Sequence, residues 1–579
     1  MKFSALALDY DGTIAVNGRF VPAVRNAIED ARAQGIVVLL VTGRRLPELV
    51  VVAGDLTCFD AIVGENGAVL TFPSNGRLIR IGRRPNPALV KEIKRIGVDI
   101  SVGESVIEAA AEDAPRILEV IRRLEQPLAI IFNRDRLMVL PQSISKATGL
   151  REALFALRLS IHNTVGIGDA ENDHDLLDAC EVGVAVGWGS PALRAVADEV
   201  IEGAGPEAVA GFIARLSQQP RLSAAQMGRR RLLLGHQEDG EPVELAVRGR
   251  TMLIAGEPGT GKSWLTGLIC EQLILQGYCL CIIDPEGDYR SLETLPNVLR
   301  LGGDEPPPRS RELVGTLRHP DVSVIIDLSK ISHHEKSEYI DTLLALLATL
   351  RRRTGLPHKI VLDEAHHFLG GSASASRVDP ELAGYIFVTY RISGLDPAIR
   401  ATKDAVVFVT HESDPVEADV IWSLQPGARA TPDAFHSLTL NEAVLLPGAQ
   451  ESKGRTRRFR LAPRLTAHVR HRTKYLDMPV SESQAFVFTV HGHPGPRAQS
   501  LKSFIELLGI LPIEEIEAHL PRHDFSRWID DVFRDGTLAA NLRSIESQGA
   551  DARASIDAIA QAIRERYETS SALKPPAKD

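Results

Sequence analysis

The chain has 579 residues, of which 44% are hydrophobic and 24% are charged, close to the averages of globular proteins. This composition excludes a disordered chain, and at about 150 residues per domain the length predicts several folding units. The net charge of −9, from 66 Lys and Arg against 75 Asp and Glu, excludes a polycation that coats nucleic acid with its whole surface.

Targeting signals and membrane spans are not expected. The first apolar run, residues 3–8, ends at Asp9 and is too short for a secretory signal. Apolar stretches such as residues 343–350 are too short to cross a bilayer. The five cysteines are scattered and fit neither a disulfide framework nor a CxxC zinc site. We therefore expect a cytoplasmic protein without a membrane partner.

Residues 1 to about 215 alternate short aliphatic runs with amphipathic stretches. Residues 3–8 and 36–41 predict buried strands, and residues 21–34 predict a helix that ends at Gly35. This alternation is typical of a parallel sheet covered by helices.

Oxygen-bearing side chains follow three predicted strands of this first domain. They are Asp9 and Asp11, then Thr42 before Gly43, and finally Asp169 to Asp173. Parallel sheets bind ligands at the carboxyl ends of their strands, and oxygen ligands without a thiolate suit Mg²⁺. One carboxylate can attack a phosphorus centre while another handles the proton, with the metal and Lys146 neutralising charge.

In this order, the residues resemble the motifs of the haloacid dehalogenase (HAD) superfamily, in its Cof-type or sugar-phosphatase-like branch. The resemblance covers about residues 1–215 and implies a Rossmann-like core with a small α/β cap at about residues 81–141. It also implies that Asp9 is the nucleophile that forms an aspartyl-phosphate, and that Asp11 is the general acid and base.

The same resemblance implies the remaining ligands of this site. The expected phosphate ligands are Thr42, Gly43, Lys146 and Asn172. The expected Mg²⁺ ligands are Asp9, Asp169, Asp173 and the backbone carbonyl of Asp11. The substrate would be a phosphorylated small molecule selected by the cap. Asn66-Gly67 is typical of a hairpin turn, and we assign no chemistry to it.

A linker is expected at residues 216–229, followed by a second α/β unit at residues 230–450. In this unit a strand at residues 251–255 precedes an amphipathic helix. The loop between them reads Gly256-Glu257-Pro258-Gly259-Thr260-Gly261-Lys262-Ser263, which is the GxxxxGK[ST] phosphate-binding pattern in its required context. Lys262 would reach the β- and γ-phosphates, and the Ser263 hydroxyl would bind Mg²⁺. ATP and Mg²⁺ are therefore the expected cofactors.

Two further strands are expected to bring polar residues to the same edge. The strand at residues 359–362 precedes Asp363 and Glu364, which would hold the Mg²⁺ shell and orient the attacking water, respectively. The strand at residues 405–409 precedes Thr410 and His411, where His411 could sense the γ-phosphate.

The pair His366 and His367 follows the same strand as Glu364. Both could be metal ligands, but the spacing of the HExxH motif is absent. We therefore favour a structural or supporting role for them.

These motifs, together with the strand ends at residues 284–288 and 324–329, resemble the HerA/FtsK-like branch of P-loop ATPases. The resemblance covers about residues 230–447 and implies a RecA-like core. It also implies a ring-shaped homo-oligomer that moves DNA or protein, with a Gln sensor and an arginine from the neighbouring subunit. Here Glu412 stands where the Gln sensor is expected. Arg391 is the candidate for the arginine that acts on a neighbour, and an ordinary surface arginine is the alternative.

Residues 451–579 predict a basic, strand-like stretch followed by a small helical module. The stretch at residues 453–474 has no acidic residue. Its arginines and histidines are Arg455, Arg457, Arg458, Arg460, Arg464, Arg470, Arg472, His468 and His471. Such a stretch could bind the phosphates of nucleic acid, and a solvated or partner-docking surface is the alternative. Helices are expected at residues 501–508 and 528–545.

The sequence thus predicts a multi-domain α/β protein with a HAD core and cap, a RecA-like P-loop core and a small, mostly helical C-terminal module. The preferred function is a Mg²⁺-dependent phosphomonoesterase joined in one chain to an ATP-binding and ATP-hydrolysing domain. One alternative is a ring ATPase that acts on DNA and carries an accessory phosphatase. Another is a nucleotide sensor that gates the phosphatase.

Overall fold

The computed structural model describes residues 3–133, 135–218, 230–247, 251–370, 377–379, 382–400, 406–412, 414–424, 435, 437–439, 441–446, 456–467, 476, 480, 484–490, 493–533, 535–547 and 551–567. Contacts divide the chain into two compact units. One contains residues 1–285 and 289–467, and the other contains residues 286–288 and 468–579. The two largest sheets in the described residues of the first unit have eight and eleven strands, and they form the core of the first domain and the P-loop core.

The first domain is built on a sheet of strand order β14-β13-β12-β1-β4-β5-β6-β7. All strands from β14 to β5 are parallel, and β6 and β7 continue the sheet as antiparallel strands. The strands are β1 (Ala5–Leu8), β4 (Val37–Val41), β5 (Ala61–Gly64), β6 (Val69–Phe72), β7 (Arg77–Arg80), β12 (Thr164–Gly168), β13 (Val182–Val186) and β14 (Glu199–Ile201). A short hairpin joins β2 (Ala15–Val16) and β3 (Arg19–Phe20). The predicted parallel sheet is confirmed.

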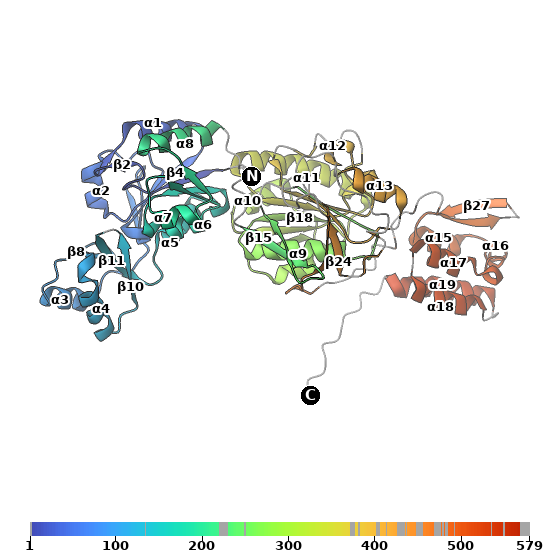
Figure 1. Cartoon of the computed structure of the whole chain (residues 1–579). Helices are drawn as coiled ribbons and strands as arrows, with labels where there is room; N and C mark the ends of the chain where they lie inside the picture. Colours follow the sequence, from blue (N-terminus) through green and yellow to red (C-terminus); the bar gives the residue numbers. More distant parts are fainter. Residues whose placement is uncertain are drawn as a thin grey trace. The chain divides into compact units, whose positions relative to one another are not determined.

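Helices cover both faces of this sheet because successive side chains of a strand point to opposite faces. Leu6 and Leu8 pack with α1 and α8, whereas Ala5 and Ala7 pack with α5, α6 and α7. Figure 1 shows α1 and α8 side by side over the sheet. The helices are α1 (Pro22–Ala33), α2 (Leu46–Ala53), α5 (Lys146–Leu157), α6 (His174–Ala179), α7 (Pro191–Val196) and α8 (Pro206–Gln218).

The cap is a four-stranded antiparallel sheet of order β10-β11-β9-β8. Helices α3 and α4 pack on one of its faces, while Met138 and Leu140 on the other face pack against Ala68 and Val69 of the core. The elements are α3 (Pro87–Arg95), β8 (Ser101–Val102), β9 (Ile107–Ala110), α4 (Ala114–Arg123), β10 (Leu128–Asn133) and β11 (Arg136–Pro141). They lie within the expected range of residues 81–141.

The P-loop core has a sheet of order β16-β15-β25-β24-β23-β17-β22-β21-β18-β20-β19. Strands β23 to β19 in this order are parallel, and β24, β25, β15 and β16 extend the sheet as antiparallel strands. The strands are β15 (Arg231–His236), β16 (Pro242–Ala246), β17 (Met252–Ala255), β18 (Leu280–Asp284), β19 (Val298–Gly302), β20 (Ser323–Asp327), β21 (Lys359–Leu362), β22 (Tyr385–Thr389), β23 (Val406–Val409), β24 (Glu442–Leu445) and β25 (Arg457–Leu461).

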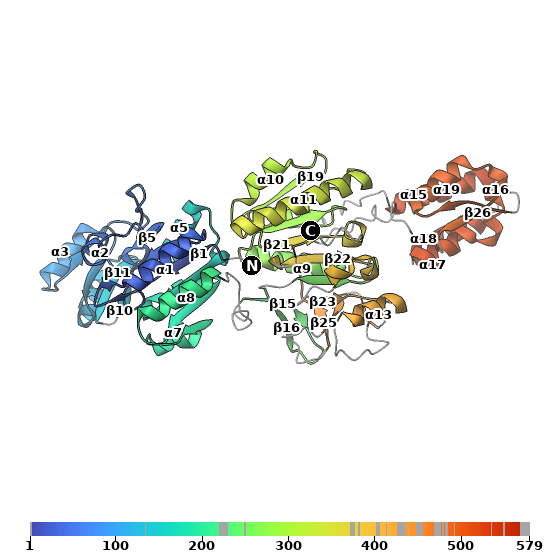
Figure 2. The same cartoon turned by 90° about the horizontal axis from the view of Figure 1, so that it is seen from above.

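Alternate residues of β17 again face opposite helices. Leu253 and Ala255 pack in one core with α10 and α11, and Met252 and Ile254 pack in another with α9. In Figures 1 and 2, α10 and α11 lie together on one side of this sheet. The helices are α9 (Lys262–Leu275), α10 (Ser310–Leu317), α11 (His333–Thr354), α12 (Pro397–Arg400) and α13 (Pro415–Ser423).

The position of β25 differs from the expected domain boundary at residue 450. Arg457–Leu461 forms a strand, as expected, but it pairs with β24 and β15. The structure thus places this part of the basic stretch in the P-loop sheet instead of the C-terminal module. Its physical reason is burial, since Phe459 enters the core that also contains α9. Residues 451–455 and 468–474 of that stretch, and residues 219–229 of the expected linker, lie outside the described residues.

In its described residues, the C-terminal module combines a hairpin with five helices. The hairpin, β26 (Phe486–Val490) with β27 (His493–Ala498), was not predicted. The helices are α15 (Leu501–Ile510), α16 (Ile513–Glu517), α17 (Asp524–Phe533), α18 (Gly536–Ser547) and α19 (Ala552–Tyr567). Phe488, Phe504 and Trp528 share one buried core. Among the described residues of the whole chain, every helix is too short or too polar to cross a membrane.

Candidate functional sites

The first site forms where three neighbouring parallel strands end. Leu8 of β1 pairs with Ile167 of β12 and with Leu40 of β4. The residues that follow these strands therefore share one sheet edge. Asp9 and Asp169 are both buried there. The predicted juxtaposition of strand ends is what the structure shows.

Lys146 connects the acids of this site. Its Nζ lies 2.6 Å from Asp9 Oδ1 and 2.5 Å from Asp173 Oδ1, and the Lys146 side chain has no exposed surface. Lys146 is the first residue of α5, which Ser145 begins with a capping box. The start of α5 thus places one buried cation between two carboxylates that lie 164 residues apart in sequence.

Three carboxylates around this lysine form a candidate metal centre. Asp9, Asp169 and Asp173 each offer a ligand oxygen, and these oxygens lie within 4.8 Å of one another. Burial, followed by the charge of Asp173, raises the pKa of Asp9 well above its usual range. Burial acts to lower the pKa of Lys146, but Asp173 and Asp9 raise it on balance. A buried, oxygen-only donor set with more acids than cations fits Mg²⁺.

The loop after the metal acids is organised by Asp173. Its Oδ2 accepts the backbone N–H groups of Asp169 at 3.0 Å and of Ala170 at 3.1 Å. Its other oxygen accepts from Lys146. Asp173 therefore shapes the loop as well as being a candidate ligand. Asn172 Nδ2 donates to Asn66 Oδ1 at 3.3 Å.

Asp11, the predicted acid and base, is paired with a residue to which we assigned no role. Arg44 donates from Nε to Asp11 Oδ2 at 2.6 Å and from Nη2 to Asp11 Oδ1 at 2.7 Å. The backbone N–H of Arg44 also donates to the hydroxyl of Thr42, at 3.1 Å. Trp188 Nε1 donates to the Gly12 carbonyl at 2.7 Å. The Thr42-Gly43-Arg44 sequence carried the signal for Arg44, whereas nothing marked Trp188.

The segment at Glu65 and Asn66, read as a simple turn, connects the core to the cap. Glu65 is 2% exposed, and its carboxylate accepts the backbone N–H groups of Glu104 at 2.9 Å and Ser105 at 2.8 Å. Asn66 is also buried, with φ at 53°. The Asn-Gly pair predicted the bend of the backbone correctly. It gave no sign that the neighbouring Glu65 accepts hydrogen bonds from the backbone of the cap.

The second site is the phosphate-binding loop between β17 and α9. Gly256, Gly259 and Gly261 have φ values of 142°, 80° and 111°, a region that favours glycine. A Cβ on Gly256 would lie 2.3 Å from Thr410 Oγ1. The loop leads into the N-terminus of α9, where backbone N–H groups and the helix dipole favour a phosphate. Its geometry therefore fits the phosphates of ATP.

Side chains of the loop contact each other and the end of β23. Lys262 Nζ donates to the Glu257 carbonyl at 2.9 Å, and the hydroxyls of Thr260 and Thr410 lie 2.7 Å apart. The predicted sensor, His411, has its Nδ1 3.5 Å from Glu257 Oε2. The structure thus joins the predicted sensor segment to the loop. Ser263 is the second residue of α9.

Asp363 and Glu364 follow β21, which is separated from β17 by β22. Both acids are buried, and the backbone N–H of Glu364 donates to Asp363 Oδ1 at 2.9 Å. Burial lowers the pKa of His366 to about 2, and the charge of Lys262 acts in the same direction.

The residue at the expected Gln position, Glu412, and the candidate arginine, Arg391, differ in exposure. Glu412 is 2% exposed, and burial raises its pKa to about 7. Arg391, the candidate for acting on a neighbour, has a side chain that is 55% exposed, with its Nε 4.0 Å from Glu417 Oε1. Arg391 is thus accessible, as either interpretation of it requires.

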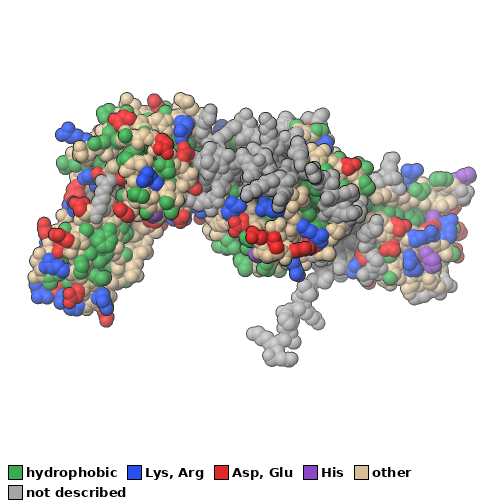
Figure 3. Space-filling model, in the orientation of Figure 1, with side chains coloured by type: hydrophobic (Ala, Val, Ile, Leu, Met, Phe, Trp, Pro, Cys, Tyr) green, Lys and Arg blue, Asp and Glu red, His purple; other side chains and the backbone are tan. Residues whose placement is uncertain are grey.

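In the described part of the basic stretch, Arg458 and Arg464 are held by other residues of the second domain. Arg458 donates to Glu442 and Ser437, and Arg464 lies over the ring of Trp264. On the face drawn in Figure 3, basic and acidic side chains are interspersed. These contacts favour the solvated or docking interpretation for this part of the stretch.

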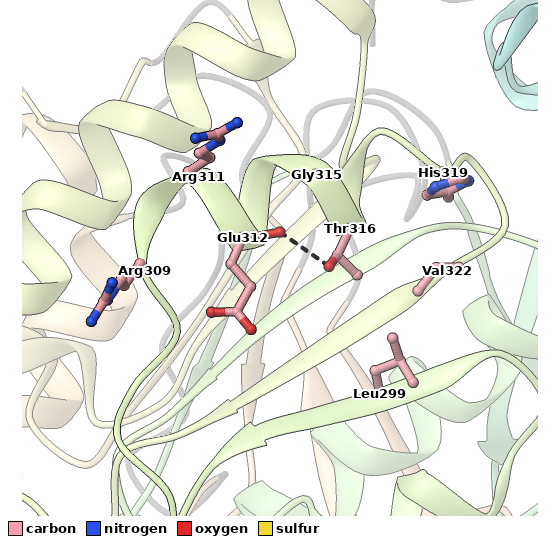
Figure 4. Close-up of a pocket in the computed structure, with 8 residues that line it drawn as sticks. All are labelled: Leu299, Arg309, Arg311, Glu312, Gly315, Thr316, His319 and Val322. Carbon is pink, nitrogen blue, oxygen red and sulfur yellow. Dashed lines mark hydrogen bonds between the residues drawn. The ribbon is translucent and has the colours of Figure 1, made fainter.

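A further pocket, of about 650 Å³, opens between α10 and the edge strand β19. Figure 4 shows Glu312 and Thr316 on α10 facing the strand that carries Leu299, with Arg311 pointing away. None of the lining residues is a predicted site residue, and the pocket brings no paired catalytic groups together.

Comparisons with known proteins match the same two segments. Residues 6–104 and 98–213 match the family described as haloacid dehalogenase-like hydrolase, and residues 237–354 match the central domain of the helicase HerA. Over 221 residues the chain is 27% identical to the phosphoglycolate phosphatase of Methanothermobacter thermautotrophicus, covering 36% of this chain and 97% of that protein. It is 25% identical over 213 residues to the phosphoglycolate phosphatase of Methanosarcina mazei, covering 35% and 91%.

Proposed function

Because the chain joins a haloacid dehalogenase-like hydrolase domain to a HerA central domain, we propose that it is a Mg²⁺-dependent phosphomonoesterase linked to an ATPase. The observation that carries the proposal is the buried contact of Lys146 with both Asp9 and Asp173. A lysine held this way keeps a nucleophilic carboxylate beside a cation that can also receive a phosphate oxygen.

In the proposed reaction, Asp9 attacks the phosphorus and the bond to the leaving oxygen breaks. Asp11 gives its proton to the leaving alcohol, and then takes a proton from the water that hydrolyses the aspartyl-phosphate. Bound Mg²⁺ would be held by Asp9, Asp169 and Asp173 and would neutralise the phosphate charge. Asp11 must leave the Arg44 ion pair in order to carry a proton.

The proposed substrates are small phosphorylated carboxylates, because the relatives are phosphoglycolate phosphatases. Arg44 supports this class, because it directly follows the expected phosphate ligands Thr42 and Gly43 and its backbone N–H donates to the Thr42 hydroxyl. Arginine binds carboxylates through two parallel hydrogen bonds, and Arg44 already holds Asp11 in that way.

The test is phosphate release from a panel of phosphorylated acids and sugars, with Mg²⁺ or with a chelator. We expect release only with Mg²⁺, and we expect Asp9→Asn to reduce kcat by at least about a thousandfold, because the nucleophile is lost. Asp55→Asn is the matched control, since the Asp55 side chain is 62% exposed. Equal activity of Asp9→Asn and the unaltered protein would refute the phosphatase.

A second candidate, in which ATP gates the phosphatase, is favoured by contacts between the two cores. His162 of the first core has Nδ1 2.9 Å from Glu181 Oε2 and Nε2 2.9 Å from the carbonyl of Gln276. The Tyr278 hydroxyl donates to Glu181 at 3.0 Å. Gln276 directly follows α9, whose first residue is Lys262. ATP binding at one end of α9 is thereby linked, in this proposal, to the phosphatase core at the other end.

A ring ATPase acting on DNA is the remaining candidate, and it rests on the HerA match. Mass measurement by light scattering, with and without ATP, tests the ring. Measuring the rate of ATP hydrolysis with and without DNA tests whether the ATPase acts on DNA. A protein that stays monomeric with ATP and hydrolyses it at the same rate with DNA would exclude this candidate while leaving the phosphatase untouched.

A further inference from the structure

We propose that Glu364, His366 and His367 form a site for a divalent transition-metal ion such as Zn²⁺, and that an ion held there inhibits ATP hydrolysis. The three residues lie directly after β21, and His366 and His367 belong to the 3-10 turn Ala365–His367. Each offers one ligand atom, and these atoms lie within 4.8 Å of one another. The inhibition rests on the proposed ATPase, whereas binding of the ion does not.

The hydrogen bonds around His366 prepare one ring nitrogen for a metal. The Thr389 hydroxyl donates to the carbonyl of Arg391 at 3.1 Å and accepts the backbone N–H of Arg391 at 3.0 Å. A hydroxyl has one proton and two lone pairs, so a Thr389 hydroxyl that donates to Arg391 has a lone pair left to accept from His366 Nδ1, 3.0 Å away, in the tautomer with the proton on Nδ1. Nε2 of His366 therefore carries the lone pair. Metal-binding histidines are commonly oriented by such a donated N–H.

That nitrogen has no other use in the described part of the chain. The His366 side chain is 5% exposed, and its buried Nε2 has no hydrogen-bond partner among the described residues. Burying a polar atom without a partner is unfavourable. A metal ion at this position would satisfy it.

The donor set selects the kind of metal. Two imidazoles and one carboxylate suit Zn²⁺ and similar ions, whereas Mg²⁺ prefers oxygen ligands alone. With bonds of about 2.0 Å, a tetrahedral ion needs ligand atoms about 3.3 Å apart. The side chains would thus close in by at most about 1.5 Å, which rotation of the partly exposed His367 and of Glu364 can provide. Three protein ligands leave the fourth position open to water.

Binding would act on hydrolysis through Glu364. In the proposed ATPase this carboxylate orients the attacking water, and a carboxylate oxygen bound to a metal can no longer do so. The ring centroids of His366 and His367 lie 4.0 Å apart, so both imidazoles would hold the ion beside this residue. The expected state with metal is one that binds ATP and hydrolyses it slowly.

Binding is tested with the untagged full chain, using Co²⁺ as a coloured substitute for Zn²⁺. Excess Mg²⁺ occupies the carboxylate site at Asp9. We expect the visible absorption bands of four-coordinate Co²⁺, lost when Zn²⁺ is added. His367→Ala, or the milder His367→Gln, should weaken Co²⁺ binding at least about tenfold. His334→Ala is the control, because His334 is 83% exposed and has its own acidic neighbour, Glu338, at 3.6 Å.

The consequence is tested by adding Zn²⁺ to the ATPase assay. The unaltered protein and His334→Ala should be inhibited at the same Zn²⁺ concentration, and His367→Ala should need at least about ten times more. Equal Co²⁺ affinity of His367→Ala and the unaltered protein would overturn the site. Co²⁺ binding at the site without inhibition by Zn²⁺ would overturn the regulatory half alone. Absence of any ATPase activity would refute the proposed ATPase, and the Co²⁺ spectra would still decide the site.

Discussion

Lys146 is buried without exposed surface, and this is tolerated because two carboxylates contact its ammonium group. A buried charge is costly unless it is paired. The same reasoning applies to the acids, because Asp9 and Asp173 share one lysine and the carboxylate of Asp169 lies beside theirs. The centre therefore carries excess negative charge, which a divalent cation would balance.

Replacing this lysine should make the stability of the first domain depend on Mg²⁺. In Lys146→Met two buried acids, Asp9 and Asp173, lose their cation, and breaking a buried pair of this kind costs about 3–5 kcal/mol. We expect a lower melting temperature in a chelator and a larger rise on adding Mg²⁺ than in the unaltered protein, measured by thermal unfolding. Lys94→Met on the exposed face of α3 is the control, and it should respond to Mg²⁺ as the unaltered protein does.

Glu412 should make stability depend on pH. Its usual pKa is 4.5, and burial raises it to about 7. Between these values the unfolded chain ionises the carboxyl while the folded protein keeps it protonated, so the free energy of unfolding falls as pH rises through this window. Above about pH 7 the loss is complete.

Glu412→Gln removes this titration. The variant should be more stable than the unaltered protein at pH 8, by about 1–3 kcal/mol, and the difference should shrink towards pH 5. Denaturant unfolding at both pH values measures this. Glu338→Gln is the control, because Glu338 is 72% exposed. A difference that grows on lowering the pH would contradict the assignment.

At the scale of elements, the phosphate-binding loop depends on space as much as on its sequence pattern. A Cβ on Gly256 would lie 2.3 Å from Thr410 Oγ1 and 2.8 Å from the carbonyl of His411. The φ of Gly256, 142°, is also unfavourable for other residues. The end of β23 therefore packs directly against the loop that would hold ATP.

Gly256→Ala should push the loop and the end of β23 apart. We expect ATP to bind at least about tenfold more weakly, a loss of about 1.4 kcal/mol, measured by calorimetry. Gly315→Ala in α10 is the control, since a Cβ there meets nothing within 4 Å. That variant should bind ATP normally and be as stable as the unaltered protein or slightly more so.

At the scale of the whole molecule, the first two cores meet through a buried polar cluster within one compact unit. The rings of His162 and Tyr278 stack with centroids 3.9 Å apart, and Glu181 has no exposed surface. Both nitrogens of His162 face oxygen atoms that accept hydrogen bonds. Because its residues form so many hydrogen bonds with one another, the cluster allows few alternative arrangements. A link that transmits a change from one site to another requires this property.

Tyr278→Phe should weaken this link without altering either site. The ring and its stacking stay, but Glu181 loses the hydroxyl that donates to both of its oxygens at 3.1 and 3.0 Å. If ATP gates the phosphatase, the ratio of kcat/KM with ATP to kcat/KM without it should move towards one. Tyr339→Phe is the control, because the Tyr339 hydroxyl donates to the Pro308 carbonyl within the second core, at 2.8 Å. An unchanged ratio in Tyr278→Phe would argue against this route.

The motifs could be predicted from the sequence because each is local. For each motif, the neighbouring residues show that it lies at the end of a strand. An aliphatic run precedes Asp9-Tyr10-Asp11, and a helix follows the run from Gly256 to Ser263. Likewise, the helix expected at residues 21–34 is α1 (Pro22–Ala33), because helical periodicity and a terminal glycine are properties of one segment.

Pairings between distant segments could not be predicted in the same way. Three contacts join segments whose periodicity does not indicate their partners. They are the contacts of Arg44 with Asp11, of Glu65 with the cap, and of β25 with β24. The hairpin β26–β27 was missed because two short strands give a weak pattern compared with the helices around them.

The sequence by itself determined the types of candidate site residues, their order along the chain, and the two folds that present them. Only the tertiary structure decided which charges face each other, since a buried ion pair depends on the packing of segments far apart in the chain. Lys146 is the clearest case. Its residue type and helix start are local, but its position between Asp9 and Asp173 exists only because β1, β12 and α5 pack around one sheet edge.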